Sequence, residues 1–137
     1  MRGLRIGELA ARAGVNLQTV YYYERRGLVP APPRSAANHR LYSERDVLRV
    51  RFIQRARRLG FSLAEIGELL SLRARPGARC GEVLVRARSK LAQIDRRIAA
   101  LRRMRRALGR LVQECEGSLP ATDCPILAAL QGAEQAL

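Results

Sequence analysis

The chain has 137 residues, and its 26 Lys and Arg against 12 Asp and Glu give a formal net charge of +14. This length fits one domain, or one small domain with an extension, and excludes most multidomain enzymes. The charge favours a polyanionic partner over an acidic small substrate, although a general bias toward arginine is an alternative explanation, since 25 of the 26 basic residues are Arg.

Hydropathy and cysteine content exclude further classes of protein. Apolar residues make up 47% of the chain and aromatic residues 4%, and the abundance of Ala and Leu predicts a mainly α fold. No apolar run approaches the roughly 18 residues that span a bilayer, and no signal-peptide core is present, so we expect a cytoplasmic protein that does not bind membranes. Three cysteines are an odd number for a reducing compartment, which argues against an internal disulfide framework.

Two short helices joined by a glycine-containing turn are predicted near the N-terminus. Residues 7–13 have helical composition and end at Gly14. Asn16 can then cap a second helix that runs to about Arg26, before Gly27. This pattern is typical of a helix-turn-helix, whose second helix enters the major groove of DNA; an ordinary helical hairpin is the alternative.

Residues 30–42 contain three prolines followed by a strand-like stretch, and we predict a short wing there. Ser43 with Asp46 resembles a variant capping box, and Ser62 with Glu65 forms a second pair of this kind at the same spacing. Each pair predicts the start of a further helix, the first ending at residue 60 and the second at about residue 72.

One long helix is predicted from Glu82 to about Cys115, where the chain has no proline and a single glycine. Its apolar residues recur at alternating steps of three and four over more than four heptads, with one polar exception. The positions are Leu84, Ala87, Leu91, Ile94, Ile98, Leu101, Arg105, Leu108, Val112 and Cys115. Such a seam needs a partner helix, and the same helix of a second copy is the economical one, which predicts a homodimer. A helix buried in a larger monomeric bundle is the alternative.

The cysteines Cys80, Cys115 and Cys124 are spread over the C-terminal half of the chain. At about 1.5 Å per helical residue, Cys80 and Cys115 of one chain should lie roughly 50 Å apart. If the two long helices pair antiparallel, Cys80 of one subunit meets Cys115 of its partner, and the following loop can present Cys124 as a third sulfur. The dimer would then carry two sites with one metal ion each, Cys80 coming from one subunit and the other two cysteines from its partner.

Three sulfurs without a nearby histidine favour a large thiophilic ion. Structural Zn(II) sites usually have four ligands, and the single histidine, His39, lies in the predicted wing. Hg(II) fits this donor set best, with Pb(II) or Cd(II) next. The alternatives are that Cys115 is only a seam residue and the other two are incidental, or that the thiols form a redox switch. The redox reading is the weaker one, because no Cys-x-x-Cys motif is present.

The N-terminal half contains the motifs IGELA (6–10), GV (14–15), TVYYYERRGL (19–28), RLY (40–42) and LGFSLAEI (59–66). With these motifs the chain resembles the MerR family of transcriptional regulators over nearly its whole length. The three cysteines match the heavy-metal branch of that family, and the sequence CPIL (124–127) is similar to that of its mercury-sensing members. Lead-sensing members share much the same cysteine spacing.

The resemblance implies three parts: a winged helix-turn-helix DNA-binding domain at 1–75, a linker with a long antiparallel coiled-coil dimerisation helix at 76–115, and a metal-binding loop with a short helix and tail at 116–137. It implies a homodimer without catalytic activity, which acts with RNA polymerase on double-stranded promoter DNA. Without metal, such a regulator represses a promoter whose −35 and −10 elements are too widely spaced. When metal binds, it activates that promoter by untwisting the DNA.

The residues expected to contact DNA lie on the second helix and in the wing. They are Gln18, Thr19, Tyr21, Tyr22, Arg25, Arg40 and Tyr42. Side chains of a recognition helix reach base edges or phosphates, and Arg40 and Tyr42 match the wing positions that grip the DNA backbone in the family. Tyr21 stands where the family usually has an arginine, and His39 where it often has a tyrosine, which implies a different operator preference.

Overall fold

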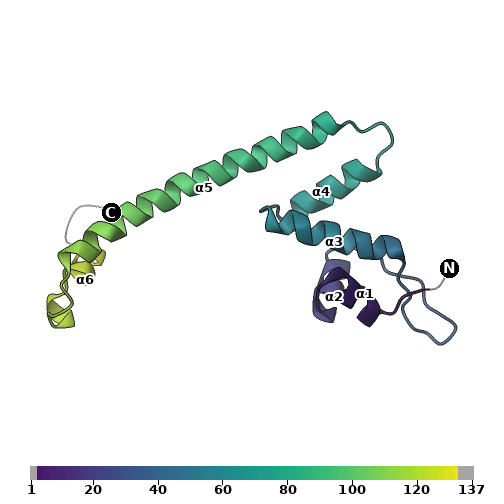
Figure 1. Ribbon diagram of the computed structural model, residues 1–137, viewed down its shortest axis with the longest axis horizontal. Coiled ribbons are helices and arrows are strands. Elements are labelled where there is room, and N and C mark those ends of the chain that lie inside the picture. The colour runs from purple at the N-terminus through teal and green to yellow at the C-terminus, as the bar shows by residue number, and fades with distance from the viewer. Residues whose placement is uncertain (1–2, 133–137) are drawn as a thin grey trace. The chain divides into compact units, whose positions relative to one another are not determined.

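The computed structural model describes residues 3–132 and is helical throughout most of that range, which confirms the mainly α fold class (Figure 1). The helices are α1 (Ile6–Ala13), α2 (Leu17–Arg25), α3 (Glu44–Arg58), α4 (Leu63–Ala74), α5 (Cys80–Glu114), the short 3-10 helix η1 (Ala121–Asp123) and α6 (Pro125–Leu130). The chain forms two compact units, one ending at Ala87 and the other beginning at Arg88. Each unit is described by itself.

The first two helices are joined by the predicted glycine turn. Gly14 follows α1 with φ +75°, a left-handed conformation that favours glycine. Asn16 then caps α2, since its Oδ1 accepts the backbone N–H of Thr19 at 2.8 Å. The two helices and their turn are therefore as the sequence predicts.

The third and fourth helices begin at the two predicted capping boxes. The backbone N–H of Ser43 donates to Asp46 at 2.8 Å, and that of Asp46 donates back to the Ser43 hydroxyl at 3.4 Å. Ser62 and Glu65 form the same reciprocal pair with distances of 2.7 and 3.1 Å. Helix α4 continues to Ala74, slightly beyond its predicted end.

The buried face of α2 fixes this helix within the first unit. Val20 and Tyr23 are completely buried and belong to one core with residues of α1, α3 and α4. The Tyr23 hydroxyl also donates to Gln54 Oε1 of α3 at 2.7 Å. Burying an apolar side chain of this size contributes about 1.5–3 kcal/mol, so α2 is held in place by its inner face while its outer face remains available.

The predicted wing contains no regular strand among the described residues. Two isolated antiparallel bridges take its place, one between Leu4 and Tyr42 and one between Arg34 and Arg40. Leu4 and Tyr42 exchange both backbone hydrogen bonds, at 2.8 and 2.7 Å. The prolines of the 30–33 segment lack the N–H donors that a longer ladder needs, which explains why the expected strand-like stretch does not extend.

The first unit includes the beginning of α5, which packs onto the preceding helices. Arg86 forms an ion pair with Glu68 of α4. Val83 and Ala87 line an apolar pocket together with side chains of α3 and α4, including Phe52. The start of α5 at Cys80 is also two residues before the predicted one.

The second unit consists of the rest of α5, a loop with η1, and α6. Leu111 is the one buried side chain of α5, and together with Met104 and Leu130 it lines a pocket between α5 and α6. The seam of α5 is uncovered in the single chain: Leu101 is 62% and Leu108 57% exposed. The predicted tail after Gly132 lies outside the described residues, and within them no helix is long and apolar enough to cross a membrane.

Candidate functional site

The outer face of α2 combines cationic and aromatic side chains. Tyr22 is 36% exposed, and the guanidinium carbons of Arg25 and Arg26 each lie 5.9 Å from the centre of its ring. Arg26 also donates to the Tyr22 hydroxyl at 3.3 Å. Gln18 is exposed on the same helix, whereas the Thr19 hydroxyl is engaged in the N-terminal cap through Asn16 at 3.0 Å. Such a surface has the donors that phosphates and base edges require.

The wing is joined to α2 through Glu24. The Glu24 carboxylate accepts one hydrogen bond from the Tyr42 hydroxyl and forms an ion pair with Arg40. The Glu24 side chain is only 10% exposed, so this carboxylate is largely removed from water and depends on both partners. The guanidinium carbon of Arg40 lies 5.1 Å from the centre of the Tyr21 ring.

The side chain of Tyr42, one of the residues expected to contact DNA, is buried in the first unit. It is 1% exposed, and its hydroxyl donates to Glu24. Burial, reinforced by the bond to Glu24, raises the pKa of Tyr42 to about 12. The phenol therefore remains protonated at neutral pH, and it donates a hydrogen bond to the Glu24 carboxylate.

Glu24 is the residue that the sequence does not single out. Its one signal is that it is the acidic residue inside the otherwise aromatic and basic stretch YYYERR. Its partners Arg40 and Tyr42 lie beyond a proline-rich segment, so the contact depends on tertiary folding and not on local spacing.

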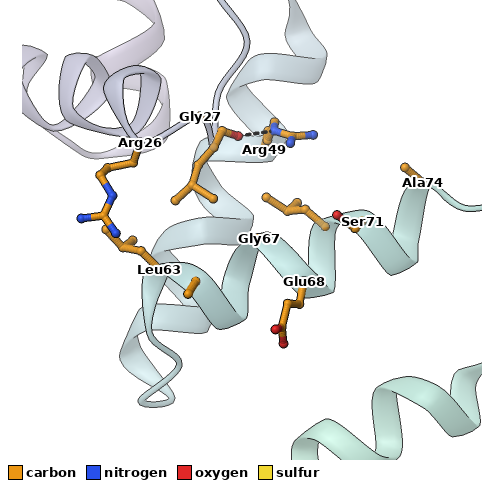
Figure 2. Close-up of a pocket in the computed structure, with 11 residues that line it drawn as sticks. Arg26, Gly27, Arg49, Leu63, Gly67, Glu68, Ser71 and Ala74 are labelled. Atoms are coloured by element: carbon orange, nitrogen blue, oxygen red, sulfur yellow. Dashed lines mark hydrogen bonds between the residues drawn. The ribbon is translucent and has the colours of Figure 1, made fainter.

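A pocket of about 520 Å³ lies between the end of α2 and α4 (Figure 2). Arg26 and Glu68 line it, and Arg49 donates from Nε to the backbone carbonyl of Leu28 at its edge. None of the lining residues is a cysteine or belongs to the exposed face of α2 or the wing, apart from Arg26 at the junction. The pocket is thus separate from both candidate sites.

Two of the three cysteines come together in the second unit. Cys124 immediately precedes α6, and Cys115 is near enough to be one of the groups that lower the pKa of its thiol. The pKa of Cys124 is lowered, chiefly by the backbone of Leu127 in the first turn of α6, with the backbone of Ile126 and the Cys115 side chain adding to the effect and desolvation opposing it. The thiolate is the form that binds metals, so this pair has the chemistry of a soft-metal ligand set.

Cys80 lies apart from this pair along the chain. It is exposed and is the first residue of α5, whereas Cys115 directly follows the last. Within residues 3–132 of one chain, no three His, Cys, Asp or Glu side chains form a group that could hold a metal ion.

Two family models match the chain. The model described as MerR HTH family regulatory protein matches residues 4–72, and the model described as MerR, DNA binding matches residues 47–111.

Known proteins resemble the chain over nearly its whole length. A mercuric resistance operon regulatory protein of Serratia marcescens is 42% identical over 98% of this chain and 92% of its own. The crystal structure of the regulator PbrR691 from Ralstonia metallidurans CH34 with lead(II) is 41% identical, covers 93% of this chain and 98% of its own, and has a TM-score of 0.83. The structure of MerR from Bacillus megaterium MB1 with mercury(II) is 36% identical, covers 93% and 99%, and has a TM-score of 0.72.

Proposed function

The chain belongs to the MerR family of transcriptional regulators, and from that premise we propose that it responds to Hg(II), repressing a promoter without metal and activating it when the ion binds. The family and its homologues are transcriptional regulators and not enzymes, and family members bind promoter DNA and act as dimers. The chain is accordingly a metal-responsive, DNA-binding regulator; the ion, its ligands and the mechanism belong to the proposal.

The thiol pair of Cys115 and Cys124 is the observation that carries this proposal. Two neighbouring thiols, one of them with a lowered pKa, suit a thiophilic ion better than Mg²⁺ or Ca²⁺. Cys80 of the partner subunit would supply the third sulfur in an antiparallel dimer. The 42% identity to a mercuric resistance regulator favours Hg(II) over other thiophilic ions.

The position of Cys80 suggests how metal binding would reach the DNA. Cys80 begins α5 directly after the loop that leaves α4, and the first turns of α5 belong to the DNA-binding unit. A metal shared with the partner's two other cysteines would bind the end of one long helix to the start of the other. This would favour one orientation of the two DNA-binding units over another and so change the twist of the DNA that they hold. RNA polymerase could then contact both promoter elements at the same time.

The test is a metal competition on the reduced dimer, followed by thiolate-to-metal ultraviolet absorption. We expect two Hg(II) ions per dimer in a three-sulfur environment, and loss of Hg(II)-dependent promoter activation in Cys80→Ser, Cys115→Ser and Cys124→Ser. Ser118→Ala, at an exposed position of the loop between Cys115 and Cys124 that supplies no proposed ligand, is the matched control and should respond normally. Full activation by a chain with all three cysteines changed to serine would refute the proposal.

A second candidate is a Pb(II)-responsive regulator, favoured by the 41% identity and TM-score of 0.83 to PbrR691 in its lead(II) complex. Promoter activation at equal occupancy of the site decides between the two, because Hg(II) binds thiolates more tightly than Pb(II) whichever ion is the natural ligand. Hg(II) should activate more strongly if mercury is the natural ligand. Stronger activation by Pb(II) or Cd(II) at equal occupancy would assign the site to that ion.

A further inference from the structure

The contact between Tyr21 and Arg40 joins the two segments expected to contact DNA, helix α2 and the wing. Tyr21 belongs to α2 and Arg40 to the wing, and the guanidinium carbon lies 5.1 Å from the centre of the ring. A guanidinium at this distance from an aromatic face is attracted by the ring quadrupole. Since Arg40 covers a face of the Tyr21 ring, that face is not available for stacking on a base.

Arg40 is oriented by a second contact as well. One of its terminal nitrogens pairs with Glu24, which is 10% exposed, while the Arg40 side chain itself remains 33% exposed. A guanidinium has five N–H donors in a fixed fork, so the contact with Glu24 engages only part of them. Moving Arg40 away would leave a largely buried carboxylate without its cation, which is strongly unfavourable.

We propose that Tyr21 acts on DNA through Arg40: its ring is the platform on which the wing's guanidinium rests, and the stacked pair presents to a DNA phosphate the N–H groups that Glu24 leaves free. Tyr21 and Glu24 are then positioning residues, and Arg40 is the group that touches the DNA. The inference rests on the proposed function in that it takes DNA as the ligand of this surface, but it adds which residue makes the contact and which ones orient it.

A double-mutant cycle on the full-length dimer tests this inference by operator-DNA affinity. We expect Tyr21→Ala to weaken binding about two- to fivefold, the range of an exposed cation–π contact, and Tyr21→Phe, which keeps the ring, to bind like wild type. In an Arg40→Gln background, Tyr21→Ala should cause no further loss. Arg34→Gln, another wing arginine, which bonds to the Asn38 carbonyl and not to Tyr21, is the matched control, and its effect should add to that of Tyr21→Ala.

The salt dependence of binding gives a readout that a purely structural role would not change. If Tyr21→Ala releases one phosphate contact, the slope of log affinity against log salt should fall by about 0.9, the same decrease as in Arg40→Gln. Should Arg40→Gln unfold because Glu24 is left unpaired, the neutral pair Glu24→Gln with Arg40→Gln serves as the background instead.

Two results would overturn the inference: additive effects of Tyr21→Ala and Arg40→Gln, which would mean that Tyr21 touches DNA directly, or equal losses in Tyr21→Phe and Tyr21→Ala, which would assign the effect to the hydroxyl. Failure of the proposed function is distinguishable from either, because it would appear in the wild-type protein as absence of operator binding or of a metal response.

Discussion

Tyr42 is the residue that shows how burial changes a role. Its hydroxyl donates to Glu24 from a position that is 1% exposed, and Glu24 in turn pairs with Arg40. One buried phenol thus supports the carboxylate on which the orientation of the wing depends.

Tyr42→Phe removes this hydroxyl while keeping the ring, and should lower the free energy of unfolding by about 1–2 kcal/mol, since a hydrogen bond to a charged, largely buried acceptor is lost. Chemical denaturation measures the change. Tyr22→Phe is the matched control, because the Tyr22 hydroxyl accepts only an exposed bond from Arg26, and we expect it to be as stable as wild type. Equal stability of the two variants would contradict this account.

The raised pKa of Tyr42 also predicts a pH dependence. The folded state favours the neutral phenol, so its contribution to stability is complete below the ordinary pKa of 10.0 and is lost as the pH rises toward about 12. A spectroscopic titration of tyrosinate should show a late component near pH 12 that is absent in Tyr42→Phe. If the phenol of Tyr42 ionised near pH 10, the buried bond to Glu24 would be refuted.

Among the elements, the helix ends follow most directly from local sequence. The hydroxyl of Ser62 accepts the backbone N–H of Glu65 at 3.1 Å at the start of α4. Ser62→Ala should therefore destabilise the first unit by about 1 kcal/mol. Ser71→Ala, inside the same helix and exposed, loses no such cap and should leave stability unchanged or slightly higher because Ala is the better helix former. Thermal unfolding compares the two, and a loss in Ser71→Ala as large as in Ser62→Ala would disprove the capping argument.

Sequence reasoning reached the elements whose determinants are local. Asn16 and Ser62 each have their partner three residues away, so both caps could be predicted from the sequence. The heptads of α5, with one polar exception, likewise predicted one long helix. The wing was less accessible, because strand formation depends on pairing with a distant segment, here Leu4 with Tyr42. The contact between Glu24 and Tyr42 could not be inferred for the same reason, because it is tertiary and depends on the burial of Tyr42.

At the scale of the whole molecule, the uncovered seam of α5 is the feature that a dimer would bury. Leu101→Glu places a charge in that seam, where Leu101 is 62% exposed in the single chain. Each dimer loses two buried leucines at about 1.5 kcal/mol or more apiece, so we expect dimer dissociation to increase on the order of a hundredfold. Ala99→Glu introduces the same residue at an exposed position of α5 outside the seam and should leave the dimer intact. Sedimentation measures both, and dissociation by Ala99→Glu alone would place the interface elsewhere.

The dimer also allows the origin of the three sulfurs to be tested directly. Consider a mixed dimer of one Cys80→Ser chain and one Cys124→Ser chain. If each site is shared between subunits, one of the two sites lacks two cysteines and the other keeps all three. The complete site combines Cys80 of the second chain with Cys115 and Cys124 of the first. Because either homodimer has no complete site, the mixed dimer should recover one three-sulfur Hg(II) ion where each parent has none. Two differently tagged chains, co-expressed and purified through both tags, provide the sample. If every site used the cysteines of one chain only, mixing could not restore one, and the absence of a three-sulfur absorption band in the mixed dimer would rule out the shared arrangement.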